Sequence, residues 1–176
     1  ALVVGLSYVF TLSVNWLLKP VEKHINDGFV KDAKRMLSQM PNMTIVGITG
    51  TNGKTTTTRL ISHIVKNNGH RVGFTTSDGI YIQNTMLSKG DTTGPLSAEF
   101  ILKDPTVEFA VLETARGGIL RSGLGYSKCD IGVLTNIKED HLGLNDIHTL
   151  KDLTKVKRVV LDSVKKDGWA IINADD

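Results

Sequence analysis

The chain has 176 residues, of which 40% are hydrophobic and 22% are charged, a composition that is sufficient for one packed domain and that excludes wholesale disorder. The formal net charge is only +3, and 21 Lys and Arg residues are interleaved with 18 Asp and Glu residues, which argues against nucleic-acid binding. The single cysteine, Cys129, excludes an internal disulfide and any zinc site that needs several thiolates.

Residues 1–18 contain no charged side chain and are mostly apolar. This length is near the lower limit for a membrane-spanning helix, and several hydroxyl and amide side chains weaken that assignment. The basic residues between Lys19 and Arg35 would hold the next segment on the cytoplasmic side of a membrane. We therefore expect either a membrane anchor followed by a cytoplasmic domain, or a buried or interfacial helix of a truncated domain.

A domain boundary is expected near Pro41-Asn42, which would end a short amphipathic helix at Val30–Met40. Residues 1–42 are thus expected to form an apolar helix and a linker helix, and residues 43–176 a separate domain. Because the sequence starts at Ala1 and stops directly after an apolar run, we interpret it as part of a longer protein.

From residue 43 onward, short apolar runs alternate with helix-like stretches. This alternation indicates an α/β domain with a mostly parallel sheet flanked by helices. Such sheets bind ligands in the loops beyond the C-terminal ends of their strands. The expected strands are Thr44–Ile48, Val72–Phe74, Phe109–Leu112, Ile131–Leu134 and Trp169–Ile172, and the expected helices lie near Thr55–Asn67, Ser97–Leu102, Gly118–Leu124 and Leu150–Val164.

The strongest motif, Thr49-Gly-Thr-Asn-Gly-Lys-Thr55, follows the first expected strand and opens the first expected helix; we call residues 49–55 the phosphate loop. In such a loop, glycines let backbone N–H groups converge on phosphate, and the helix N-terminus adds partial positive charge. The general pattern would place its first glycine where Ile48 stands, so this loop is a variant. Lys54 is placed to reach the β- and γ-phosphates, and Thr55 to bind Mg²⁺ through its hydroxyl.

Two later strands also end in polar groups. Glu113 follows Phe109–Leu112, a position from which a carboxylate can hold Mg²⁺. Thr135-Asn136 and Asp140-His141 follow Ile131–Leu134. The predicted nucleotide-binding residues are Gly50, Thr51, Asn52, Gly53, Lys54, Thr55, Thr56 and Asn136.

The phosphate loop, together with Thr135-Asn136 and Asp140-His141-Leu142, resembles the Mur ligase family, in which ATP phosphorylates a carboxylate and an amine then attacks the acyl phosphate. The resemblance implies that Thr55 and Glu113 serve one Mg²⁺, and that Glu113 and His141 serve a second. It further implies that Lys157, or alternatively Lys155, is a carbamylated lysine. The catalytic residues are therefore predicted to be Lys54, His141 and Lys157.

The middle of the chain is most similar to the ligase half of the cyanophycin synthetases, which adds arginine to aspartate side chains of an Asp–Arg polymer. The similarity covers about Ile45 to Asp176 and includes the runs Thr75–Ile82, Lys89–Pro95 and Glu113–Arg121. In this reading Arg116 and Arg121 bind a substrate carboxylate, because a guanidinium can form paired hydrogen bonds with it, and Thr92 and Thr93 contact the metal or the substrate. The final Asn173-Ala-Asp-Asp176 receives no role.

Three alternatives remain at this stage. Residues 1–43 depart from the cyanophycin synthetases and are more similar to membrane-associated ligases that extend a muramoyl peptide. A P-loop ATPase would share the phosphate loop but would not predict Asp140-His141 or the Glu113–Arg121 run. The third alternative is a membrane-associated fragment that has no activity of its own. Under every ligase reading, the expected partners are small amino-acid or peptide substrates. The resemblance also implies that residues 43–176 are the ATP-binding central domain and that the family's C-terminal domain is missing from this chain.

Overall fold

The structure is a computed structural model that describes residues 14, 16, 18–21, 24, 43–139, 143 and 147–176. The chain divides into two units, Ala1–Met40 and Pro41–Asp176. In the first unit the described residues are helical and exposed. Across the described part of the chain, no helix combines the length and the apolar character needed to span a membrane. The predicted apolar helix at residues 1–18 lies largely outside the described residues, and the predicted amphipathic helix at residues 30–40 lies entirely outside them.

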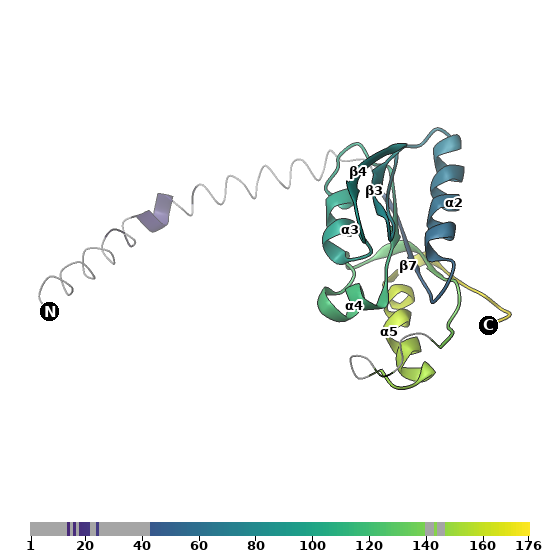
Figure 1. Cartoon of the computed structure of the whole chain (residues 1–176). Helices are drawn as coiled ribbons and strands as arrows, with labels where there is room; N and C mark the ends of the chain where they lie inside the picture. Colours follow the sequence, from purple (N-terminus) through teal and green to yellow (C-terminus); the bar gives the residue numbers. More distant parts are fainter. Residues whose placement is uncertain are drawn as a thin grey trace, which may run out of the picture. The chain divides into compact units, whose positions relative to one another are not determined.

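The second unit is built on one sheet of seven strands in the order β4-β3-β2-β5-β1-β6-β7. Figure 1 shows α2 on one side of this sheet and α3 on the other. The pairs formed by β1 with β5 and β6, by β5 with β2, and by β6 with β7 are parallel, whereas β3 joins β2 and β4 in antiparallel pairs. The strands are β1 (Thr44–Thr49), β2 (Val72–Thr75), β3 (Gly79–Ile82), β4 (Thr85–Lys89), β5 (Phe109–Glu113), β6 (Cys129–Leu134) and β7 (Val164–Ile172). The helices are α2 (Lys54–Asn67), α3 (Pro95–Leu102), α4 (Arg116–Ser122) and α5 (Leu150–Asp162).

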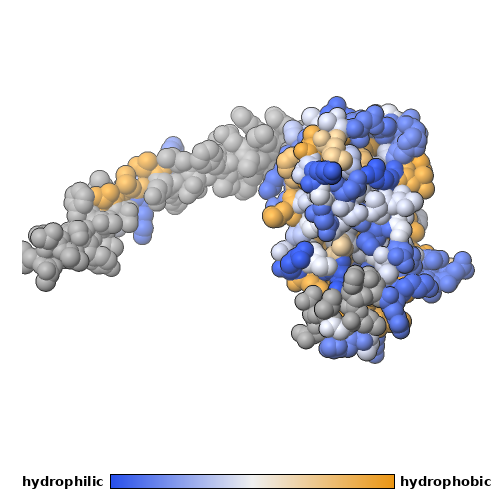
Figure 2. Space-filling model, in the orientation of Figure 1, coloured by the Kyte–Doolittle hydropathy of each residue, from blue (hydrophilic) through white to orange (hydrophobic). Residues whose placement is uncertain are grey.

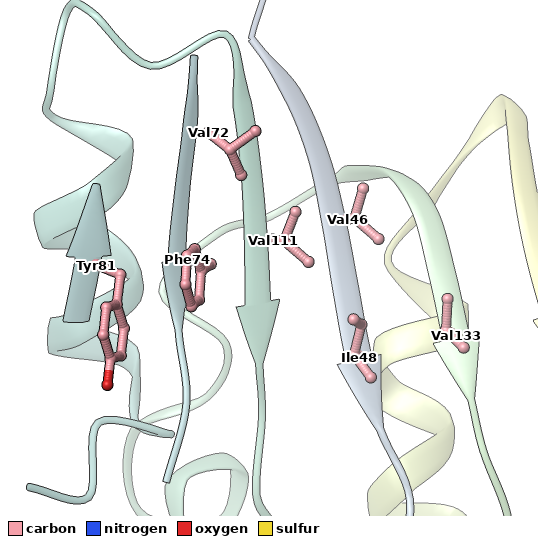
Figure 3. Packing of buried hydrophobic residues seen from close by; sticks show 7 residues of the cluster. All are labelled: Val46, Ile48, Val72, Phe74, Tyr81, Val111 and Val133. Atoms are coloured by element: carbon pink, nitrogen blue, oxygen red, sulfur yellow. The ribbon is translucent and has the colours of Figure 1, made fainter. Parts of the chain in front are cut away.

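Helices cover both faces of the sheet, so the central strands are apolar on both sides. Side chains alternate between the faces along each strand. Val46 and Ile48 of β1 belong to one hydrophobic cluster (Figure 3), and Ile61 of α2 packs against that cluster. Ile45 instead packs with the cluster that contains Ile101 of α3. The visible outer surface of this unit is mostly hydrophilic, with small hydrophobic groups between (Figure 2). The core therefore lies between helices and sheet on both sides of β1 and β5.

The structure confirms every expected strand and helix of the α/β domain, but it adds an antiparallel β3–β4 hairpin that the sequence analysis did not predict. All five residues of β4 are exposed, so this strand lacks the alternation of a half-buried strand. The prediction was also wrong at the start of β7, which begins at Val164 rather than Trp169. Val164 pairs with Cys129 and a register shift follows, which explains why Lys165–Gly168 has no strand-like pattern.

Candidate functional site

The phosphate loop joins the central strand β1 to α2, and two of its glycines adopt φ angles that other residues rarely adopt. Gly50 has φ of 149° and Gly53 has φ of 82°. A β-carbon at Gly50 would collide with the hydroxyl of Thr135. Gly53 is the N-cap of α2, and no side chain caps that helix. The first-turn N–H groups of α2 therefore have no side-chain acceptor, which is the arrangement that binds anions at helix N-termini.

Two lysines donate to the same loop carbonyl. Lys54 Nζ lies 3.0 Å from the carbonyl oxygen of Gly50 and 2.8 Å from that of Thr51. Lys157 Nζ, from the buried face of α5, lies 2.6 Å from the carbonyl oxygen of Gly50. The Lys157 residue is only 2% exposed. The carbonyl of Gly50 therefore has two lysine donors, one from the phosphate loop and one from α5.

Two oxygen-bearing side chains from different strand ends, those of Glu113 and Ser77, meet the hydroxyl of Thr55 in the first turn of α2. This hydroxyl donates to Glu113 Oε2 at 2.8 Å and lies 3.1 Å from Ser77 Oγ. Glu113 ends β5 and is 3% exposed. Burial raises the pKa of Glu113, and this effect outweighs the opposing hydrogen bond from Thr55 and positive charge of Lys54. A cation at this position would favour the ionised carboxylate.

The loop that follows β6 holds the phosphate loop by reciprocal hydrogen bonds; we call its described residues 135–139 the β6 loop. Thr51 N donates to the carbonyl oxygen of Asn136 at 2.9 Å, and Asn52 N donates to Asn136 Oδ1 at 3.0 Å. In return, Asn136 Nδ2 and Thr135 Oγ1 donate to the carbonyl oxygen of Asn52 at 3.0 and 2.7 Å. The backbone amides of Thr51 and Asn52 are thus directed toward Asn136. The backbone amides in the first turn of α2 have no side-chain cap.

These groups border a cavity of about 400 Å³, which we call the phosphate cavity. The predicted residues that line it are Thr51, Asn52, Gly53, Lys54, Thr55, Thr56 and Glu113. Gly50 belongs to the phosphate loop but does not line the cavity, and Asn136 and Lys157 contact the loop instead. Ser77 and Asp91 also line the cavity, although the sequence analysis assigned them no role. Ser77 follows the end of β2, so the rule that ligands bind beyond strand ends was a signal that could have found it.

A second cavity, of about 250 Å³, shares Asp91 and Thr93 with the phosphate cavity and is also lined by Arg121. Of the two predicted substrate arginines, Arg121 therefore borders a cavity, and Arg116 begins α4. Of the two predicted threonines, Thr93 borders both cavities. The hydroxyl of Thr92 instead donates to the carbonyl oxygen of Thr76 at 2.7 Å in the interior.

The predicted ligand His141 and its neighbour Asp140 lie outside the described residues. The residues that the structure does describe contain no group of three or more His, Cys, Asp and Glu placed to hold a metal ion. Around Thr55, the described residues bring two hydroxyls and one carboxylate together. The role of His141 stays a prediction.

Several known proteins are similar to this chain. Cyanophycin synthetase of Geminocystis herdmanii is 61% identical over 132 residues, which are 75% of this chain and 15% of that protein. The enzyme of the same name from Trichormus variabilis is 55% identical over 149 residues, 85% of this chain and 16% of that protein. The UDP-N-acetylmuramoyl-L-alanyl-D-glutamate–2,6-diaminopimelate ligase of Phocaeicola vulgatus is 30% identical over 137 residues, 75% of this chain and 28% of that protein. The chain thus spans a small part of the length of each.

Solved structures agree with these similarities. A UDP-N-acetylmuramoyl-L-alanyl-D-glutamate–2,6-diaminopimelate ligase matches with a TM-score of 0.65 and 28% identity, covering 78% of this chain and 28% of that one. The MurF ligase of Thermotoga maritima in complex with ADP matches with a TM-score of 0.54 and 26% identity, covering 85% of this chain and 32% of that one. A family model described as the Mur ligase middle domain matches residues 48–176. By that match, and by the phosphate loop and strand-end groups that lie within it, the chain belongs to the Mur ligase middle-domain family.

Proposed function

We propose that the full-length protein containing this chain is an ATP-dependent ligase that joins a carboxylate to an amine through an acyl phosphate. The observation that carries the proposal is the contact between Thr55 and Glu113, 2.8 Å apart, beside the uncapped N-terminus of α2. One end of this arrangement suits phosphate, and the other presents oxygen ligands for a divalent cation. A solved relative, the MurF ligase of Thermotoga maritima, is in complex with ADP.

The ligand set fits Mg²⁺, which prefers oxygen ligands. Thr55 Oγ1 and Glu113 Oε2 would hold the ion bound with ATP, and Ser77 Oγ lies 3.1 Å from Thr55 Oγ1. A bound Mg²⁺ would supply charge neutralisation for the transferred phosphoryl group. Glu113 and His141 would hold the second Mg²⁺ that the family resemblance implies. This part of the proposal depends on His141, which lies outside the described residues.

Lys54 must turn away from the loop carbonyls to bind the β- and γ-phosphates. The hydrogen bond from Lys157 to the Gly50 carbonyl, at 2.6 Å, supports this movement because that carbonyl stays satisfied. The backbone N–H groups of the first turn of α2 would then bind the phosphate oxygens. In such a transfer the protein contributes mainly positioning and charge stabilisation.

Lys157 is the better of the two candidates for the carbamylated lysine. It is buried beside the phosphate loop, whereas Lys155 has a side chain that is 68% exposed and pairs with Asp152. Carbamylation would convert the amine of Lys157 into a carbamate, whose remaining N–H can still donate to the Gly50 carbonyl and whose carboxylate oxygens are acceptors. Intact-mass measurements of wild type and of the Lys157→Met variant, each with and without bicarbonate, test this assignment. We expect a mass increase that requires bicarbonate and that occurs only in wild type.

The substrate pair that the similarities favour is arginine with the aspartate side chain of an Asp–Arg polymer. Identities of 55–61% to cyanophycin synthetases support it, against 30% to a diaminopimelate ligase. Arg121 in the second cavity, with Thr93 at the boundary of the two, would bind the substrate carboxylate. The alternative is a muramoyl peptide as acceptor, supported by the TM-score of 0.65 to a muramoyl-peptide ligase.

The test is an assay of ADP and phosphate release by the full-length protein against paired substrates. We expect arginine plus an Asp–Arg primer to stimulate release, and Lys54→Ala and Glu113→Gln to abolish the stimulation. Thr55→Ser is the matched control, because it keeps the hydroxyl, whereas Thr55→Val removes it. Stimulation by D-alanyl-D-alanine with a muramoyl tripeptide would support the alternative acceptor. Hydrolysis that is indifferent to every substrate pair would reject the ligase and favour a P-loop ATPase.

A further inference from the structure

The final segment of the chain turns sharply after the edge strand β7. β7 ends at Ile172, and Asn173 Oδ1 accepts a hydrogen bond from the backbone N of Asp175 at 3.1 Å. A bond from an Asn side chain to the backbone two residues later forms a local turn. The turn is followed at once by Asp176, whose side chain is only 16% exposed.

Both carboxylate oxygens of Asp176 contact the β6 loop, which precedes it by 38–39 residues in sequence. Oδ2 accepts a hydrogen bond from the backbone N of Ile137 at 2.6 Å. Oδ1 lies 2.7 Å from Lys138 Nζ. The hydrogen bonds from Lys138 and from the Ile137 amide lower the pKa of Asp176, so the carboxylate is ionised at neutral pH.

The two residues on either side of that amide hold the phosphate loop. The carbonyl oxygen of Asn136 accepts from Thr51 N at 2.9 Å. The backbone N of Lys138 donates to Thr51 Oγ1 at 3.0 Å, and the same hydroxyl lies 3.2 Å from the carbonyl oxygen of Lys138. Asp176 therefore holds the part of the β6 loop that in turn holds Thr51. None of these bonds joins Asp176 directly to the phosphate loop.

We propose that Asp176 is a positioning residue of the nucleotide site, acting through Ile137 on Thr51. This proposal rests on the proposed function, because it assigns the site to ATP. Asn173 shapes the turn that delivers Asp176 to the β6 loop. Loss of the carboxylate frees the β6 loop, and the phosphate loop then samples geometries that do not match the phosphates. The expected signature is a higher KM for ATP with kcat largely kept at saturating ATP.

Three substitutions in the full-length protein separate the two contacts. Asp176→Ala removes both, Asp176→Asn keeps an oxygen acceptor for the Ile137 amide, and Lys138→Met removes only a partly exposed ion pair. Because an exposed ion pair contributes little and a hydrogen bond from an acceptor to the backbone holds the loop directly, we expect about a tenfold rise in KM for Asp176→Ala and less than about twofold for Lys138→Met. Asp176→Asn should fall between them. Asp175→Ala, which removes the adjacent carboxylate, is the matched control and should leave KM unchanged.

Hydrogen exchange without nucleotide supplies a second readout that does not depend on the reaction. Asp176→Ala should speed exchange in peptides that span residues 135–139 and residues 49–55, while α2 beyond its first turn keeps its protection. Unchanged exchange in residues 49–55, or an unchanged KM for ATP, would overturn the positioning role. A wild-type protein that binds no ATP would instead reject the proposed function, and the exchange data would still decide the structural link.

Discussion

The amine of Lys157 lies 2.6 Å from the carbonyl oxygen of Gly50, although 107 residues separate the two in sequence. The contact joins the buried face of α5 to the start of the phosphate loop. A buried amine is costly unless it is hydrogen-bonded, so this side chain is constrained in position by the bond it makes. The loop therefore has one fixed point on α5 and another on the β6 loop, where Asn136 holds Thr51 and Asn52.

Lys157→Met should weaken ATP binding more than it weakens the fold. Methionine fills similar volume, and the Gly50 carbonyl retains Lys54 as a donor, so the free energy of unfolding should change by less than about 1.5 kcal/mol. The phosphate loop nevertheless loses its hydrogen bond to α5. Isothermal titration with a non-hydrolysable ATP analogue and urea denaturation measure the two effects. Lys155→Met, on the exposed side of the same helix, is the control; equal ATP affinity in both variants would contradict the role of Lys157.

Asn136→Asp should raise the KM for ATP by about tenfold. The substitution keeps an acceptor for the Asn52 amide but loses the donor to the Asn52 carbonyl, and it places a negative charge beside the phosphate cavity. Steady-state kinetics with varied ATP measure the change. Asn136→Ala removes both hydrogen bonds without adding charge, so a smaller effect for alanine than for aspartate would identify repulsion as the larger contribution.

Neighbouring glycines of α4 should respond to alanine with opposite signs. A β-carbon at Gly118 would lie 2.9 Å from the Thr93 carbonyl oxygen and 3.1 Å from Gly94 Cα, whereas one at Gly117 would meet only Arg121 at 3.8 Å. Gly117→Ala should therefore stabilise the helix by up to about 1 kcal/mol, and Gly118→Ala should destabilise the domain by about 1–3 kcal/mol. Thermal denaturation compares them. Equal shifts in Tm would show that the backbone around Thr93 moves to accommodate the added β-carbon without a loss of stability.

The carboxylate of Asp130 should make stability depend on pH at the acidic end. Burial acts to raise its pKa, but the amide of Ile45 at 2.8 Å and the amine of Lys165 at 2.6 Å more than offset burial, so the pKa of Asp130 is lowered below 3.8. The stabilisation is therefore present above about pH 4 and is lost as pH falls through the lowered pKa.

Denaturation of wild type and Asp130→Asn from pH 7 to pH 2 tests this dependence. The difference between the two proteins should be largest at pH 7 and should shrink below pH 4. Lys165→Met isolates the partly exposed ion pair, whose share should be about 1 kcal/mol or less. A difference that stays constant down to pH 2 would show that the ionisation of Asp130 does not stabilise the fold.

Residues at strand ends could be predicted to lie close together because the C-terminal ends of parallel strands meet at the same edge of the sheet. Glu113 was predicted from the apolar run before it and Thr55 from the phosphate-loop motif, and the structure brings their oxygens together at 2.8 Å. The apolar runs themselves are long enough to define β1, β5 and β6, since both faces of these strands are buried.

Other parts of the site depend on contacts that no local pattern encodes. The β3–β4 hairpin brings Asp91 to the cavity, yet β4 is exposed at every position and has no strand pattern. Asp176 contacts the β6 loop only because β6 and β7 are neighbours in the sheet, which residue spacing does not reveal. Lys157 could be placed on α5 from the sequence, but its contact with Gly50 required the packing of that helix against β1.

The place of β1 between β5 and β6 has a consequence during synthesis of the protein. Both neighbours of β1 lie far downstream, so a ribosome translating at about 5–20 residues per second exposes this apolar strand for on the order of ten seconds before β5 exists. Pairing between strands so distant in sequence is also slow to form. During that interval the nascent chain offers an unpaired apolar strand to other nascent chains and to chaperones, and stalled or truncated products that end before β6 should aggregate rather than bind nucleotide.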